Sequence, residues 1–576
     1  MAINQAPTNN ANTTERTPLL PPPSPPKPSN VTEQDGRDFD DPTQMPKRRR
    51  NMILVAVWLG VFLGALDGTI VATLISDISS SFQKSNQAGL LGTSYLLSTA
   101  TFTPLYGRLA DIVGRRTALL GALCLFTAGT ALCGFAPSME TLLVGRLIAG
   151  MGGGGLMSVS SIVASDLIPL KQRALFQGLA NLWFGAGSGL GGPLGGFISD
   201  RLGWRTAFVG QLPLLVLAFG LVFRNLTYKT KGQGKSKTEM IKRIDYFGSL
   251  TLVLGLGSLL FALSLKNDRN EPWSSPFVWV PLIIFVISTI AFVCVEAFYS
   301  AEPVMPLRIL KDRNGLFVGL INFTVSFVSF SILYFYPQFF EIVQQKTASQ
   351  AGAHLLPNSI ALSIGSLFAG YVIRKTGRYY YLIVVTSFFP IIALSSFIFL
   401  DEKSGFVHSW LAILPSGFGF ASVITAGLIA IIASVDREDM ATATGLTYLF
   451  RYVGQVVGVA SSASLLQAVL NTELHKRFTG PGSEKMIEKI RHVSTIIPSL
   501  PRLEQSLARE SYLLALRSVF ILNLVVAVLC FLTSLPIREY RLPESFEEEE
   551  RERREREERR RAEGREEEDG TGTEER

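Results

Sequence analysis

The sequence is poor in cysteine, and its few cysteines form no recognisable pattern. Each of the four lies in an apolar stretch, and none belongs to a CxxC or Cys/His arrangement: Cys124, Cys133, Cys294 and Cys530. This spacing argues against a zinc site and against a disulfide framework. We therefore expect four free thiols that behave as small buried hydrophobic side chains.

Catalytic and nucleotide-binding patterns are also missing. The four histidines have no paired carboxylate or nucleophile nearby in the sequence, and the glycine run at 152–155 lacks a following lysine and a preceding strand. Such a run does not predict a phosphate-binding loop. We expect neither an enzyme nor a pump driven directly by ATP, with no cofactor and no metal. No cleavable signal peptide is expected, because residues 1–46 are polar and rich in proline.

Charged residues are scarce, whereas hydrophobic residues are abundant and gather in blocks. Only 18% of the 576 residues are charged and 47% are hydrophobic, against about 25% charged in a typical soluble domain. Blocks of about 20 apolar residues can cross a bilayer as helices. The sequence predicts an all-α polytopic membrane protein in the lipid bilayer, with fourteen spans near 52–75, 89–106, 117–135, 140–165, 174–198, 206–224, 247–265, 277–298, 317–340, 353–373, 380–400, 409–435, 442–470 and 515–536.

The basic residues lie mainly in alternate loops beside these blocks. That pattern controls membrane topology and places both termini in the cytoplasm, so the net charge of +7 does not indicate nucleic-acid binding. The segment at 471–514 is an exception, because it is basic although it falls on the far side of the membrane. We expect it to be a long loop with an amphipathic segment around Glu484–Thr495.

An internal repeat divides the chain. Gly107 and Gly114, at the end of the second span, have the same spacing as Gly370 and Gly377 at the end of the tenth, and a basic residue comes next in both places. Duplicated halves are a recurrent plan of transporters. The expected parts are a disordered cytoplasmic tail (1–50), a six-helix half (51–225), a loop with an inserted helix pair (226–300), a second six-helix half (301–540) and a charged cytoplasmic tail (541–576).

Several motifs resemble those of the major facilitator superfamily. The stretch Gly107–Arg116 is similar to its signature loop, although Ile112 stands where a basic residue is usual. Leu66–Val71 is similar to the first-span motif of the fourteen-helix drug:proton antiporter branch. The remaining motifs are the span 4 arginine Arg146, the span 5 antiporter motif with Gly192, Pro193 and Gly196, and Gly203–Phe208 with Gln211 and Pro213.

Within that branch, the chain looks most like fungal vacuolar basic amino acid transporters, on Gly191–Gly196, Trp204-Arg205 and Gln211–Pro213. The resemblance implies proton-coupled antiport of basic amino acids into the vacuole by a monomer. Export of drugs or toxins across the plasma membrane is the alternative, because drug exporters share the same skeleton. A receptor or scaffold that transports nothing is a third possibility, which the charged motifs disfavour.

Two charged residues inside spans are the principal candidates for proton and substrate coupling. A carboxylate in a membrane span is costly, so Asp67 predicts a proton carrier that responds to a cationic substrate. The charge of Arg146 cannot be removed, so it needs a partner or a water-filled cavity. The alternatives are a helix-end position for Asp67, and a structural ion pair or a snorkelling side chain for Arg146.

Other residues are assigned to gating, or more weakly to the transport path. Asp111, Arg115 and Asp166, with Gly107 and Gly114, are expected to form a cytoplasmic charge cluster that opens and closes; the alternative is that they only cap helices. Arg451 is expected to face a central cavity or to pair with Asp436 or Glu438. Further polar candidates for such a cavity, which could instead be interface anchors, are Tyr95, Asn181, Trp183, Asn322, Tyr334, Tyr336 and Gln338.

The N-terminal tail contains a candidate sorting signal. Glu15 precedes a leucine pair, Leu19 and Leu20, in the arrangement of an acidic dileucine motif. Such motifs resemble signals that sorting adaptors read on proteins bound for vacuoles or lysosomes. The motif favours the vacuolar membrane over the plasma membrane.

Overall fold

A computed structural model describes residues 46–168, 170–227, 245–268, 274–299, 307–435, 440–479 and 483–540, and every regular element in these ranges is a helix. The expected tails lie largely outside these ranges, and so does the dileucine motif. The first group of helices comprises α1 (Lys47–Ser81), η2 (Ser85–Gln87), α2 (Ala88–Val113), α3 (Arg115–Gly134), α4 (Met139–Leu167), α5 (Leu170–Leu202), α6 (Trp204–Val209) and α7 (Leu212–Asn225).

A pair of helices and a second group follow along the chain. The pair is α9 (Tyr246–Asp268) and α10 (Pro276–Cys294), which continues as η3 (Val295–Tyr299). The second group comprises α11 (Leu307–Lys311), α12 (Arg313–Gln338), η4 (Phe339–Val343), α13 (Ala348–Ala353), α14 (Leu356–Thr376), α15 (Tyr380–Ser387), α16 (Phe389–Ile398), α17 (Phe406–Leu411), α18 (Leu414–Ser434), α19 (Met440–Arg477), α20 (Ser483–His492), η6 (Ser494–Ser499) and α21 (Arg502–Ser534).

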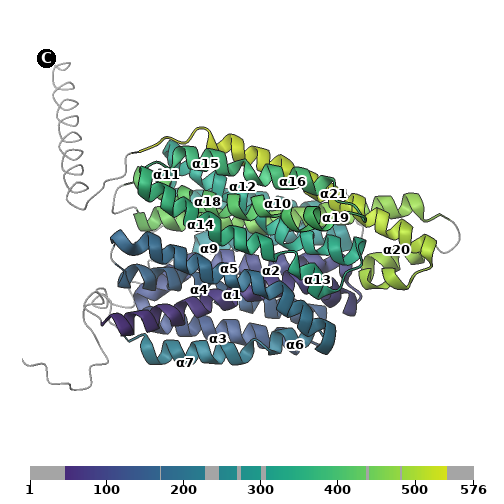
Figure 1. Cartoon of the computed structure of the whole chain (residues 1–576), viewed down its shortest axis with the longest axis horizontal. Coiled ribbons are helices and arrows are strands. Elements are labelled where there is room, and N and C mark those ends of the chain that lie inside the picture. Colours follow the sequence, from purple (N-terminus) through teal and green to yellow (C-terminus); the bar gives the residue numbers. More distant parts are fainter. Residues whose placement is uncertain are drawn as a thin grey trace, which may run out of the picture. The chain divides into compact units, whose positions relative to one another are not determined.

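Helix contacts define two bundles. Helices α1 to α7 pack mainly on one another and form the first bundle, and α11 to α21 form the second. The bundles meet along two seams, one between α5 and α13–α14 and the other between α2 and α19, while α1 contacts α12 between them. Helix α9 packs on α10 and also contacts α2 and α19, so the inserted pair lies against the second seam (Figure 1).

The long helices have the length and hydropathy of membrane spans. Eleven helical segments in the described ranges meet both criteria. The other three expected spans fall on α2, α5 and α9, which are helical but are not among the eleven. A multi-pass membrane protein is therefore confirmed, whereas the count of fourteen spans stays a prediction.

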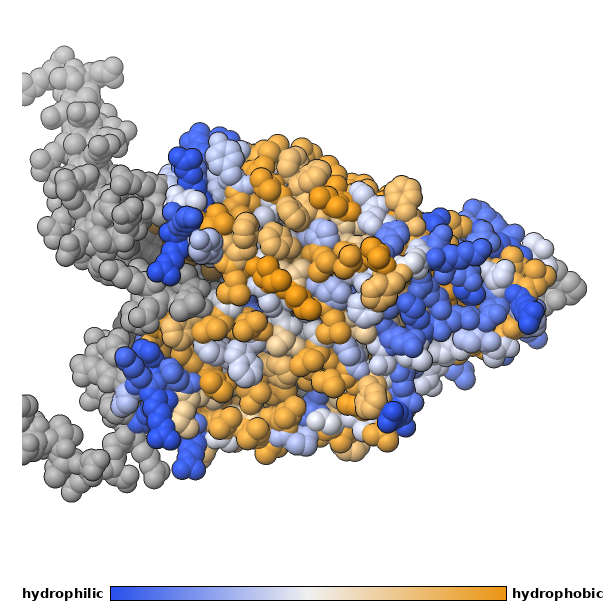
Figure 2. All heavy atoms as spheres, in the orientation of Figure 1, coloured by the Kyte–Doolittle hydropathy of each residue, from blue (hydrophilic) through white to orange (hydrophobic). Residues whose placement is uncertain are grey.

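The outer surface of the bundles is apolar along the middle of the helices. Figure 2 shows hydrophobic residues over the centre of the visible face and hydrophilic residues toward both ends of the helices. Helix α10, for example, exposes Ile283, Ile287 and Ile290. In water such a surface would be unfavourable, but it suits contact with lipid.

The exposure of the cysteines corrects one expectation. All four are free thiols, but Cys124 and Cys294 are exposed, and only Cys133 and Cys530 are buried.

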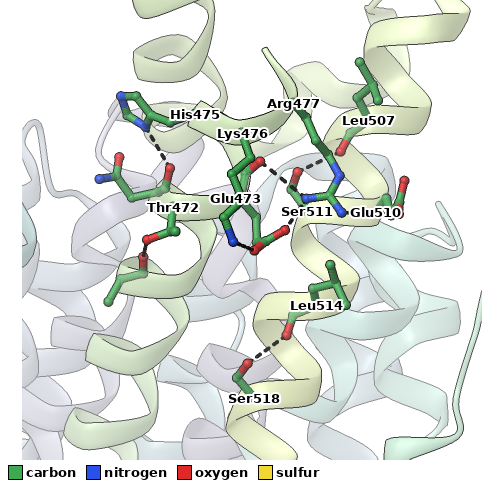
Figure 3. Close-up of polar contacts among 12 residues, drawn as sticks. Thr472, Glu473, His475, Lys476, Arg477, Leu507, Glu510, Ser511, Leu514 and Ser518 are labelled. Carbon is green, nitrogen blue, oxygen red and sulfur yellow. Dashed lines mark hydrogen bonds and ion pairs between the residues drawn. The ribbon is translucent and has the colours of Figure 1, made fainter. Parts of the chain in front are cut away.

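The segment at 471–514 is largely helical, which differs from the expected long loop. Helix α19 continues to Arg477 and α21 begins at Arg502, and α20 between them buries Ile487 and Ile490. Arg477 forms ion pairs with Glu473 on its own helix and, at 3.3 Å, with Glu510 on α21 (Figure 3). Helices α19 and α21 continue beyond the apolar spans, and the Arg477–Glu510 ion pair joins these extensions. We call this end of the bundles the opposite face, and the end where α1 begins the N-terminal face (Figure 1).

Candidate functional site

Asp67 lies in the middle part of α1 and is completely buried. Its side chain is 0% exposed, and α1 continues to Ser81, so Asp67 is not a helix-end residue. The sequence around it is apolar and small, which lets α1 pack closely against α5. Leaving this carboxylate without a cation would cost several kcal/mol or more.

Arg146 on α4 supplies that cation. Its Nη1 atom lies 2.6 Å from Asp67 Oδ2, and the Arg146 side chain is also 0% exposed. Helix α2 completes its surroundings, because Nε donates a hydrogen bond to the Leu91 carbonyl at 3.3 Å and the guanidinium lies 4.3 Å from the centre of the Tyr95 ring. Three helices of the first bundle thus hold one fully buried ion pair, and Arg146 does not snorkel.

The pair retains unused hydrogen-bonding capacity. Asp67 Oδ1 and Arg146 Nη2 are both buried and have no hydrogen-bond partner within the described ranges. Buried polar atoms are nearly always satisfied, so each of these two atoms has capacity for a further hydrogen-bond partner. A carboxylate oxygen in this position can accept a proton.

Aromatic side chains from the second bundle reach the same place. Tyr334 on α12 and Tyr452 on α19 interact electrostatically with Tyr95, and Tyr334 also interacts with the ion pair. Both phenols are buried. The ion pair therefore lies where the two bundles meet, and Tyr95 and Tyr334 are not interface anchors.

Arg451 on α19 is separate from this pair. Its Nη2 atom donates a hydrogen bond to Asn322 Oδ1 on α12 at 3.2 Å, and its guanidinium lies 4.8 Å from the Tyr448 ring centre. Asp436 and Glu438, the carboxylates expected as partners, lie outside the described residues. Arg451 therefore links two helices of the second bundle by a neutral partner, and the described ranges do not place it beside Asp67.

At the N-terminal face, two members of the expected charge cluster meet. Arg115 Nε lies 3.0 Å from Asp166 Oδ2, which joins the start of α3 to the end of α4. Gly114 connects α2 to α3 with φ 86°, a conformation that favours glycine. A Cβ on Gly107 would meet nothing within 4 Å, so its lack of a side chain is not required by packing here. The side chain of Asp111 lies outside the described residues.

The antiporter motif on α5 forms a close contact between the bundles. A Cβ on Gly192 would stand 2.7 Å from the Gly352 carbonyl oxygen, and a Cβ on Gly196 would overlap the backbone of Ser349. Pro193 lies between them, inside α5. Small residues permit such backbone contact between spans. The motif therefore closes the α5–α13 seam near the opposite face.

We expect Gly196→Ala to open this seam. The added methyl group overlaps the Ser349 backbone, and overpacking of this kind costs about 1–3 kcal/mol. Uptake at saturating substrate should fall roughly tenfold, since about 1.4 kcal/mol is a factor of ten in an equilibrium constant. Gly220→Ala is the matched control, because a Cβ on Gly220 meets no atom within 4 Å. Equal uptake rates for the two variants would contradict this role.

The described ranges contain no cluster of three or more His, Cys, Asp or Glu side chains that could hold a metal. They do contain a half-buried acid that sequence reasoning missed. Glu341 Oε2 is buried in η4 and lacks a hydrogen-bond partner in the described part of the chain. The expected ninth span ended at residue 340, and an acid just beyond a span is unremarkable. The available signal was that apolar residues continue beyond Glu341 to Val343, which places this acid inside the span.

Comparisons with known proteins agree with this architecture. The family model of the Major Facilitator Superfamily matches residues 57–459. The chain is 39% identical to the multidrug resistance protein fnx1 of Schizosaccharomyces pombe, over 86% of this chain and 93% of that protein. It is 32% identical to vacuolar basic amino acid transporter 2 of Saccharomyces cerevisiae, over 69% of this chain and 85% of that protein. A bacterial homologue of the human lysosomal transporter Spinster, solved in an inward-facing and occupied conformation, has the same fold, with a TM-score of 0.59, 17% identity and coverage of 87% of this chain and 100% of that chain.

Proposed function

The chain belongs to the Major Facilitator Superfamily and is a membrane transporter, and from this premise we propose that it is a proton-coupled antiporter of basic amino acids in the vacuolar membrane. The fully buried Asp67–Arg146 pair carries the proposal. Asp67 is the carboxylate that binds either a proton or the cationic substrate, and Arg146, whose positive charge persists, is its partner when neither is bound.

The direction of transport follows from the compartment. The vacuole interior is acidic, so a proton that enters Asp67 from the lumen leaves to the cytoplasm, and a cationic amino acid moves inward in exchange. In this proposal the N-terminal face is cytoplasmic and the opposite face is lumenal, which places both termini in the cytoplasm. The protein acts as a monomer, because the site lies between two bundles of one chain.

Two contacts are proposed as gates. The Arg115–Asp166 pair, with Asp111, Gly107 and Gly114, forms the gate at the cytoplasmic face, since ion pairs between helix ends can break and re-form as bundles move. The contact of Gly192 and Gly196 with α13 forms the lumenal gate. Alternating access to a central site requires one gate on the cytoplasmic side and one on the lumenal side. Arg451 is proposed to act on the transport path through Asn322.

Efflux of drugs across the plasma membrane is the second candidate. The match to a multidrug resistance protein over most of both chains favours it. Both functions use the same intramembrane acid, so the ion pair does not separate them. The two functions differ instead in the membrane in which the protein resides and in the substrate that it transports.

Location is tested by the N-terminal tail. Leu19→Ala with Leu20→Ala should move a fluorescently tagged protein from the vacuolar membrane to the plasma membrane, because a sorting adaptor would no longer recognise the dileucine signal with Glu15. Microscopy of living cells provides the measurement, and Pro22→Ala with Pro23→Ala in the same tail is the control. An unaltered protein that already resides at the plasma membrane would favour efflux.

The substrate is tested by uptake of labelled arginine or lysine into isolated vacuoles. ATP-energised vacuoles that contain the protein should take up more label than vacuoles that lack it, and a protonophore should remove the difference. Uptake that survives the protonophore would contradict proton coupling.

A further inference from the structure

A row of polar side chains on α12 and η4 leads from the ion pair toward the opposite face, and we call Tyr334, Gln338 and Glu341 the polar track. On α1, the side of the helix roughly opposite Asp67 also carries polar residues that are at most 5% exposed and are spaced by four, three and four positions: Thr69, Thr73, Ser76 and Ser80. On α12 and η4, Tyr334 is followed by Gln338 and Glu341 at similar spacing, and α1 contacts α12.

The polar track passes a small cavity between the bundles, which is lined by both polar and apolar side chains. Its volume is about 20 Å³, and its polar lining comes from both bundles: Ser76, Ser79, Ser85, Asn86, Gln338, Gln467, Ser494 and Tyr512. A buried water needs about 10–15 Å³ of such space and two to four polar partners. Gln467 is 6% exposed, and its Oε1 atom has no hydrogen-bond partner in the described ranges. The cavity therefore has the size and the free acceptor of a water site.

Glu341 lies beside this cavity, because its chain neighbour Ile342 and Ser76, which interacts with the Glu341 carboxylate, both line it. The charged groups that act on Glu341 from α1 and α5 are the carboxylates of Asp77 and Asp200. The Glu341 Oε2 atom has no hydrogen-bond partner in the described ranges, so it can accept a proton.

Other titratable groups lie near η4. On α21, Tyr512 interacts electrostatically with Glu341, and Arg509 forms an ion pair with Glu402. Toward α13, His354 Nε2 lies 3.1 Å from Lys346 Nζ. Partial burial lowers the pKa of Lys346, which lies between two spans. Segment η6 contributes no titratable side chain to this region.

We propose that Glu341 and this cavity form the lumenal arm of the proton path, in which Glu341 takes up a proton from the lumen and the polar track delivers it to Asp67. The proposal rests on the proposed function of proton antiport. The proton leaves the Glu341 carboxylate, passes along water and hydroxyl groups, and binds the Asp67 carboxylate before release to the cytoplasm. Glu341 serves proton transfer and does not bind the substrate.

The test compares Glu341→Gln with the unaltered full-length protein in liposomes. Two rates are measured with labelled arginine: uptake driven by a pH gradient, and exchange of arginine across the membrane at equal pH on both sides. We expect gradient-driven uptake to fall at least tenfold, whereas exchange stays within twofold, because exchange requires no net proton movement. Glu484→Gln on α20 is the control, since the Glu484 side chain is 80% exposed, and it should change neither rate.

The outcomes separate the proposal from the function on which it rests. Gradient-driven uptake that survives Glu341→Gln would overturn the proposal, and so would an equal loss of both rates. Ser76→Ala supplies a second variant if Glu341→Gln does not fold, and it should lower only gradient-driven uptake, by several fold. An unaltered protein without gradient-driven uptake would instead overturn the proposed antiport, and the proton path with it.

Discussion

Asp67→Asn is expected to abolish proton-driven uptake while leaving a folded protein in the membrane. Asparagine has nearly the size of aspartate and keeps an oxygen that can accept a hydrogen bond from Arg146, but it cannot bind and release a proton. Uptake of labelled arginine into isolated vacuoles should fall to the level of vacuoles that lack the protein. The amount of tagged protein in the membrane is measured in parallel.

Asp67→Glu provides the matched control for this loss. Glutamate keeps the titratable group but lengthens the side chain by one methylene, so partial activity is expected. Proton-driven uptake at the normal rate by Asp67→Asn would show that another acid carries the proton. In that case Glu341 is the next acid to examine.

Breaking the ion pair from the other side is expected to destabilise the protein strongly. Arg146→Gln leaves the Asp67 carboxylate buried without a cation, and loss of one partner of a buried pair costs about 3–5 kcal/mol. The double variant Asp67→Asn with Arg146→Gln places two neutral groups at hydrogen-bonding distance. It should recover most of the lost stability and none of the proton-driven uptake.

The measurement is the midpoint of thermal unfolding of the purified protein in detergent. Arg146→Gln should lower the midpoint clearly, and the double variant should return it close to that of the unaltered protein. Arg451→Gln is the comparison, because Arg451 bonds a neutral asparagine and its loss leaves no carboxylate unpaired. If the double variant were less stable than Arg146→Gln, the two residues would not act as a pair.

The sequence was sufficient to identify the charged residues but not their partners. An acid and an arginine within apolar blocks are costly, so Asp67 and Arg146 could each be recognised by composition alone. Their pairing joins residues 79 positions apart in the chain, and only the packing of α1 against α4 brings them together. The partner of Arg451 could not be predicted in this way, because it is the uncharged side-chain amide of Asn322.

Helix ends were harder to predict than helix positions. Every expected span is largely helical, although 206–224, 380–400 and 409–435 each cover two successive helices. Helices α19 and α21 also extend into the segment at 471–514, where polar residues conceal the helical pattern. Contacts between helices, such as those of Arg477 with Glu473 and Glu510, stabilise these extensions. Glu341 was overlooked for the same reason, since η4 carries the ninth span beyond its expected end.

The most direct test of the account is substrate-dependent proton movement in liposomes that contain only this protein. The liposomes are loaded at acidic pH with a pH-sensitive dye, and arginine or lysine is added outside at neutral pH. The account predicts that either amino acid makes the interior less acidic, that Asp67→Asn removes this response, and that a neutral amino acid causes none. A response to drug cations but not to arginine or lysine would contradict the substrate assignment, and uptake of arginine without any change in interior pH would contradict proton antiport.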